Sequence, residues 1–158
     1  MAIKTIGVII LMLTALYYSS SHQKTEQYKL TVLTELCTLF SHISKNIECF
    51  SKPIGEICRE YTSPLLAQYD FYTYWQEKGL REAIRKIPHI SDTVRDTLSR
   101  YAESAGHGYK DDELRLCRYM QEHLEEELKR QKEENLSKNK LYRTLPFLLV
   151  LSIVLLLY

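Results

Sequence analysis

Two apolar runs lie at the ends of the chain, with a strongly polar middle between them. The first covers residues 2–18, AIKTIGVIILMLTALYY, in which Lys4 is the only charged residue. The second covers residues 141–158, LYRTLPFLLVLSIVLLLY. A membrane-spanning helix needs about 20 apolar residues, with a lower limit of about 17. The pattern therefore predicts one transmembrane helix over residues 1–20 and another over residues 141–158.

Each run has an alternative interpretation. A cleaved signal peptide also begins with a basic residue and an apolar run. However, Leu16, Tyr17 and Tyr18 are bulky where a cleavage site prefers small residues, so we favour a span. The second run is apolar on every face, whereas a core helix normally carries one apolar stripe, so we favour a span there too.

Basic residues near the ends of the two runs predict their orientation, because cytoplasmic flanks are enriched in Lys and Arg. On the outer flank lies Lys4. Toward the middle lie Lys24, Lys29, Lys132, Lys138, Lys140 and Arg143. The bias places the middle segment in the cytoplasm, with the chain in the cell membrane.

The middle segment, residues 22–140, carries helical patterns throughout. Apolar residues recur at intervals of three and four between residues 25 and 51, which predicts an amphipathic helix. Its expected stripe is Leu33, Leu36, Cys37, Phe40, Ile43, Ile47 and Phe50. No alternating strand pattern of useful length occurs. We therefore expect an all-α fold, a small helical bundle flanked by an N-terminal and a C-terminal transmembrane helix.

Prolines, glycines and a serine mark the expected helix ends. Pro53 begins a short helix, and Ser63-Pro64 begins one that runs to Gly79. A further piece ends before Pro88, and Ser91 is a suitable N-cap for the next helix. The segment Gly106-His107-Gly108 predicts the turn before the last helix.

The last helix is expected to run without a break from Asp112 to Leu145, out of the bundle and into the second span. The alternative is a flexible charged linker. Glu126 with Arg130 and Glu134 with Lys138 are spaced as stabilising ion pairs one turn apart, so we favour the helix.

Composition excludes several classes of partner. With 21 basic and 20 acidic residues, the net charge of +1 predicts no nucleic-acid partner. The four cysteines form no CxxC pair and no zinc spacing. Cys37, Cys58 and Cys117 lie among apolar neighbours and are expected to be buried free thiols.

Candidate catalytic or metal-binding residues are few. His123 and Glu127 lie one helical turn apart, but two ligands do not make a metal site, and a solvated helix face explains both. Glu125, Glu126 and Glu127 are expected to be exposed carboxylates of ordinary pKa. We therefore expect no catalytic residue, no metal, no cofactor and no small-molecule substrate. A membrane-bound hydrolase would need a nucleophile with a positioned base, or a metal set.

The order of these segments resembles the stage III sporulation protein AB family. The N-terminal span is followed by LTVLTELCTLFSHISKNI and KPIGEICREY, then by the Trp-centred FYTYWQEKGLREAI. A Gly-x-x-Asp turn at residues 108–111 precedes the long charged helix, which ends in KLYRTLPFLLVLSIVLLLY. The resemblance covers nearly the whole chain.

The resemblance implies a non-enzymatic membrane scaffold or adaptor of the secretion-like complex between mother cell and forespore, needed for endospore formation. The family's soluble domain is similar to the cytoplasmic domain of type II secretion system F proteins. By that analogy the partners would be a secretion-type cytoplasmic ATPase and other stage III sporulation membrane proteins. The alternative is a general membrane-tethered adaptor or assembly factor of a secretion or pilus system not tied to sporulation.

The same resemblance implies three structural positions. Gly108 and Asp111 would shape the turn before the last helix, and Trp75 would anchor the core. It implies no catalytic residues, and it would place the chain in the mother-cell membrane that faces the forespore.

Overall fold

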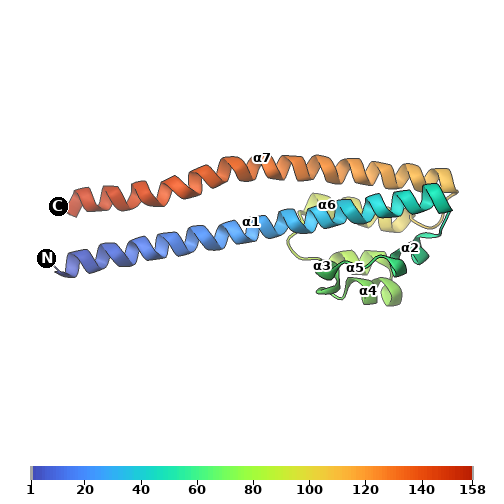
Figure 1. Ribbon diagram of the computed structural model, residues 1–158, viewed down its shortest axis with the longest axis horizontal. Helices are drawn as coiled ribbons and strands as arrows, with labels where there is room; N and C mark the ends of the chain where they lie inside the picture. The colour runs from blue at the N-terminus through green and yellow to red at the C-terminus, as the bar shows by residue number, and fades with distance from the viewer. Residues whose placement is uncertain (1, 158) are drawn as a thin grey trace. The chain divides into compact units, whose positions relative to one another are not determined.

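The computed structural model describes residues 2–157, and near both chain ends it describes only some of the side chains. Over this range the chain forms seven helices and no strand (Figure 1). The helices are α1 (Ala2–Phe50), α2 (Ile54–Glu60), α3 (Pro64–Ala67), α4 (Phe71–Lys78), α5 (Leu80–Lys86), α6 (Asp92–Ser104) and α7 (Lys110–Leu157). The predicted all-α fold is confirmed.

These helices divide between two compact units. The helical unit, Lys29–Lys129, contains the second part of α1, all of α2 to α6 and the first part of α7. The terminal unit is formed by Met1–Tyr28 together with Arg130–Tyr158. The limits predicted for the bundle, residues 22 and 140, follow from hydropathy rather than from contacts, and they stay predictions.

In the terminal unit, several large apolar side chains are exposed. They are Ile10, Leu13 and Tyr17 on α1, and Leu136, Leu148, Leu151 and Leu155 on α7. Among the residues described, no helix is both long and apolar enough to cross a membrane. This finding does not support the spans predicted over residues 1–20 and 141–158, and many of their side chains lie outside the described residues.

The core of the helical unit is built around one stripe of α1. Its buried members are Val32, Leu33, Leu36, Leu39, Phe40, Ile43 and Ile47, at the spacing that the sequence predicts. The Phe40 ring meets the buried Tyr101 ring of α6 edge to face at 4.8 Å. The short helices α2 to α5 are drawn on one side of α1 (Figure 1). Phe50, expected to continue the stripe, is exposed instead and is the last residue of α1.

Backbone conformation explains where the helices of this unit end. Beyond Phe50, Ser51 adopts a left-handed φ of 51°. The single helix predicted from Ser63-Pro64 to Gly79 is wrong, because Asp70 adopts a φ of 55° and separates α3 from α4. The other predicted helix breaks are confirmed. At one of them, the Ser91 side chain accepts a hydrogen bond from the Val94 amide at the start of α6.

The last helix, predicted to run without a break from Asp112 to Leu145, is confirmed as part of the continuous helix α7.

Candidate functional site

The turn that joins α6 to α7 holds two of the residues carried over from the family resemblance. Gly108 lies in this turn, and Asp111 lies exposed in the first helical turn of α7. Gly106 enters the turn with a φ of 85°, in the left-handed region where a side chain is strained. A Cβ on Gly108 would lie 3.3 Å from the Asp112 Cβ, so this position has little room for a side chain.

Glu113 holds this turn together from inside α7. Its Oε1 accepts hydrogen bonds from the backbone amides of Gly106 at 2.7 Å and Gly108 at 3.1 Å. Negative charge in the first turns of a helix is also favoured by the helix dipole. The residue is only 8% exposed, and its Oε2 is buried with no hydrogen-bond partner in the part of the chain described. Glu113 is therefore a buried carboxylate with hydrogen bonds to only one of its two oxygens.

Lys110 and Arg118 fasten the start of α7 to the end of α1. The Lys110 ammonium donates to the Glu48 carbonyl at 3.0 Å and to the Ser51 hydroxyl at 2.8 Å. A cation at the last carbonyls of a helix is stabilising. Arg118 pairs with the Glu48 carboxylate at 2.9 Å. We call Glu48, Ser51, Gly106, Gly108, Lys110 and Glu113 the turn cluster.

Two hollows open beside the turn cluster, and Gly108 and Glu113 line both. The smaller, of about 250 Å³, lies against Ile47 and residues 51–54. The larger, of about 430 Å³, is also lined by Ser104, Asp112, Arg115, Leu116 and Tyr119. Glu113 therefore borders two recesses of the surface.

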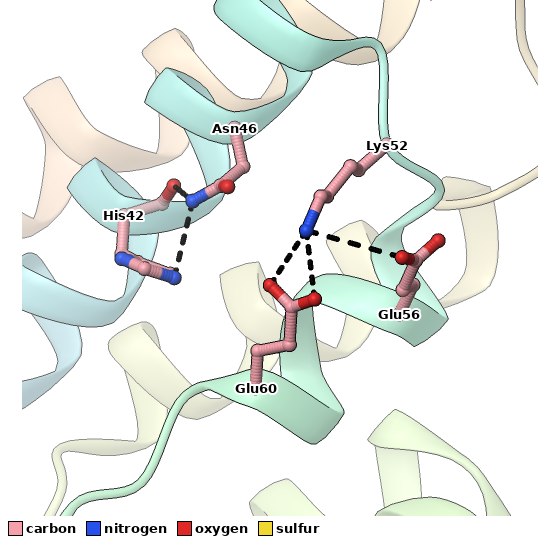
Figure 2. Close-up of polar contacts among 5 residues, drawn as sticks. All are labelled: His42, Asn46, Lys52, Glu56 and Glu60. Carbon is pink, nitrogen blue, oxygen red and sulfur yellow. Dashed lines mark hydrogen bonds and ion pairs between the residues drawn. The ribbon is translucent and has the colours of Figure 1, made fainter.

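A second polar cluster lies where α2 follows α1 (Figure 2). The Lys52 ammonium lies between two carboxylates, 2.7 Å from Glu60 Oε1 and 3.9 Å from Glu56. The hydrogen bond to Glu60 raises the pKa of Lys52 above its ordinary value. Nearby, the Asn46 amide donates to the His42 carbonyl at 2.9 Å. The Lys52 contacts tie the linker after α1 to α2, whereas the Asn46–His42 bond lies within α1.

His42 also packs on Tyr61, which continues the same cluster toward the middle of α1. The two rings lie 5.0 Å apart. The Tyr61 hydroxyl donates to Glu35 at 2.8 Å, and burial raises the pKa of Tyr61. A protonated phenol is therefore maintained as a donor, which suits a structural bond between the end of α2 and α1.

The two buried cysteines of the core, Cys58 and Cys117, have thiols that stay protonated near neutral pH. None of the four cysteines forms a disulfide bond within the described residues; Cys58 and Cys117 are buried as predicted, whereas Cys37 is only half-buried. Burial raises the pKa of the Cys58 and Cys117 thiols. The Tyr101 hydroxyl lies 3.2 Å from the Cys117 sulfur. Because the thiolate is the reactive form, these side chains serve packing.

Trp75 lies away from the turn cluster in sequence and on another helix. Its ring meets the Phe71 ring edge to face at 5.3 Å, and it borders a separate recess of about 220 Å³. Trp75 is half-buried, whereas Phe71 is 1% exposed. The structure thus brings Gly108 and Asp111 onto one turn but does not bring Trp75 to them.

The pair His123 and Glu127 differs from expectation. Glu127 is buried and accepts a hydrogen bond from the Ser91 hydroxyl at 3.4 Å, so the solvated face predicted for it is wrong. The His123 ring stacks on Tyr119 at 6.4 Å. Within the described residues, no group of three or more His, Cys, Asp or Glu side chains is arranged to hold a metal ion.

Sequence reasoning missed Glu113, which the structure makes the centre of the turn cluster. The sequence shows three acidic residues at the start of this helix, but on their own they indicate only a favourable interaction with the helix dipole. The available signal was the spacing: two glycines of a turn are followed by a carboxylate within one to two helical turns, as a reach-back cap requires.

Comparison with known proteins points to one family. A family model described as stage III sporulation protein AB matches residues 4–158. The matched range includes the helical unit and nearly all of both terminal segments. Comparison with curated proteins and with solved structures gave no match.

Proposed function

The chain belongs to the stage III sporulation protein AB family, and on that premise we propose that it is a non-enzymatic membrane scaffold. Family membership implies a role in stage III sporulation, together with other proteins of that stage. Within this role, the helical unit presents a surface in the cytoplasm to a secretion-type ATPase. The complex it serves joins mother cell and forespore in a secretion-like assembly.

The observation that carries this proposal is the layout of the chain. Along the chain, the compact helical unit is flanked by two apolar segments, and both segments belong to one terminal unit. Such a layout suits an anchored platform, because the chain continues from both ends of the helical unit into apolar segments of the terminal unit. The basic residues that flank the apolar runs on the side of the helical unit favour its cytoplasmic location.

Membrane anchoring is supported by the exposed apolar side chains of the terminal unit. Leu13 and Tyr17 are exposed on α1, and Leu151 and Leu155 on α7. Large apolar side chains gain free energy when they leave water, and lipid chains would cover them. In this proposal the two terminal segments span the mother-cell membrane that faces the forespore.

The non-enzymatic character is supported by how the ionisable groups of the helical unit are used. Lys110, Glu113 and Lys52 hold helix ends and turns. The buried Cys58 and Cys117 have raised thiol pKa values, which disfavours nucleophilic chemistry at neutral pH. A scaffold uses such groups for stability rather than for reaction.

Co-purification from sporulating cells tests this function. A tagged full-length chain is extracted in mild detergent, and its partners are identified. The proposal predicts recovery of a secretion-type ATPase and of other stage III membrane proteins. Recovery of pilus or division components would contradict it and favour an adaptor unrelated to sporulation; recovery of no partner would also contradict the scaffold role.

A further inference from the structure

We infer that the larger hollow beside the turn cluster is a docking socket for an arginine side chain of a partner protein, with Glu113 as its acidic base. The inference deepens the proposed scaffold function and rests on it for the partner's identity. It starts from the one carboxylate oxygen of the helical unit that is both buried and without a partner, Glu113 Oε2. Buried polar atoms normally have partners, so an exception calls for an explanation.

The cations nearest along the chain are already engaged elsewhere. Lys110 binds the Glu48 carbonyl and the Ser51 hydroxyl, and Arg118 pairs with the Glu48 carboxylate. Arg115 pairs with Asp112 at 2.7 Å. The negative charge of Glu113 is therefore left for a cation from outside this chain.

The larger hollow has the lining that an arginine side chain requires. Leu116 and Tyr119 offer apolar surface to the aliphatic part of the side chain, and Ser104 also lines the hollow. A guanidinium is planar, stacks on aromatic rings and donates to carboxylates, which suits Tyr119 beside Glu113. The volume of the hollow, about 430 Å³, is sufficient for one long side chain.

Entry to Glu113 requires the rim of the hollow to open. The Arg115–Asp112 pair forms part of this rim, and both side chains are more than half exposed. Exposed ion pairs of this kind contribute little stability. An arriving arginine therefore replaces Arg115 near Asp112 at low cost and reaches the Glu113 carboxylate behind it.

The surroundings indicate that the occupant belongs to a protein rather than to a small solute. Three aromatic side chains are exposed in the same part of the helical unit: Phe50, Tyr109 and Tyr119. Tyr109 is 86% exposed and lies in the turn itself. Exposed aromatic side chains around a charged recess are typical of protein contact surfaces.

An NMR titration of the full-length chain in detergent micelles tests the socket without any partner. N-acetyl-arginine methylamide is the probe, and N-acetyl-citrulline methylamide is its uncharged isostere. We expect a saturable shift of the Gly106 and Gly108 amide signals with the arginine compound only. No shift, or equal shifts with both compounds, would overturn the inference.

One variant, its matched control and a reserve variant test whether the arginine compound binds at Glu113. Glu113→Gln keeps an acceptor for the two glycine amides and removes the charge, and it should weaken arginine binding about tenfold or more. Glu122→Gln, on the exposed face of the same helix, should leave binding unchanged. If Glu113→Gln does not fold, the exposed Tyr119→Ser serves instead and should also weaken binding. Unchanged binding in the variant that is tested would contradict the socket.

The titration and the co-purification fail independently. If stage III partners are recovered but the arginine compound does not bind, the socket is wrong and the scaffold function stands. If the compound binds at Glu113 but no stage III protein is recovered, the site stands and its assignment to this partner class is wrong.

Discussion

Two aromatic rings of α4 meet edge to face, but only one of them is buried. Phe71 is 1% exposed, whereas Trp75 is half-buried beside a recess. The cost of removing a side chain follows the apolar surface it has removed from water and the cavity it leaves. At the scale of single residues, Phe71 is therefore the ring on which the packing of α4 depends most.

Phe71→Ala should lower the free energy of unfolding by about 3–5 kcal/mol, as for other fully buried rings. Trp75→Ala should cost less, about 2 kcal/mol, because part of its surface is already in water. Denaturant unfolding of the full-length chain in detergent measures both. An equal or larger loss for Trp75→Ala would contradict this ranking and support Trp75 as the core anchor that the family resemblance implies.

The buried acids of the core predict how stability depends on pH. Burial raises the pKa of Cys58, Cys117 and Tyr101 above their ordinary values of 9.0, 9.0 and 10.0. In the unfolded chain these groups lose protons near their ordinary values, but in the folded chain they remain protonated. Stability should therefore be constant with respect to these groups below about pH 8 and fall as the pH rises through 9 to 10.

Unfolding midpoints between pH 7 and pH 10.5 measure this dependence. Cys58→Ala removes one buried thiol, so the unfolding midpoint of the variant should fall less between pH 7 and pH 10.5 than that of the unmodified chain. This holds even if the variant is less stable at pH 7. Cys49 is exposed, so Cys49→Ser is the matched control and should leave the dependence unchanged. An alkaline loss that is the same in Cys58→Ala as in the unmodified chain would contradict the role of burial.

At the scale of helices, local signals predicted the breaks and distant contacts did not appear in the sequence. Pro53, Gly79 and Ser91 act on their own backbone, so their positions mark helix ends correctly. Asp70 separates α3 from α4 by adopting a left-handed backbone conformation. Because this position is not a glycine, the sequence does not indicate the break. The buried Glu127 accepts a hydrogen bond from Ser91, 36 residues earlier, and a polar helical pattern cannot indicate such a contact.

The same limit applied to the candidate site. Glycine spacing is a local signal, so the sequence predicts the turn at Gly108. The hydrogen bonds to one oxygen of Glu113, and the lack of a partner for the other, depend on how the turn folds back over α7. The attachment of α7 to α1 likewise requires residues about sixty positions apart, such as Lys110 and Ser51. Such pairings follow from tertiary packing alone.

Lys110→Met removes the cation that caps α1 from α7. It should lower the free energy of unfolding by about 1 kcal/mol, since a side-chain cation at a helix C-terminus contributes about that much. Lys129→Met changes an exposed lysine farther along the same helix and should change stability by less than about 0.5 kcal/mol. Equal effects of the two changes would contradict the capping role.

At the scale of the whole molecule, the proposal separates an anchor from a platform. The terminal unit carries exposed apolar side chains, and the helical unit has its own buried core and an exposed aromatic region at one turn. The family match extends over both units. The separation predicts that membrane retention and partner binding depend on different residues.

The double change Leu13→Arg and Leu151→Arg should release the chain from membranes in alkaline carbonate extraction. Each arginine costs about 3 kcal/mol near the centre of a spanning helix. Leu136→Arg changes another exposed leucine of α7, outside the predicted span, and should leave the chain in the membrane. Full retention of the double variant would contradict anchoring by these two segments.

Site-specific photo-crosslinking in sporulating cells tests the central claim, that the helical unit is a platform for other stage III proteins. A photoreactive amino acid replaces Tyr109, which is exposed in the turn, or Thr73, which is exposed on α4. The scaffold account predicts adducts with a secretion-type ATPase or another stage III protein from position 109, and fewer or none from position 73. Absence of such adducts from both positions, in cells where the chain is membrane-bound and folded, would contradict the account.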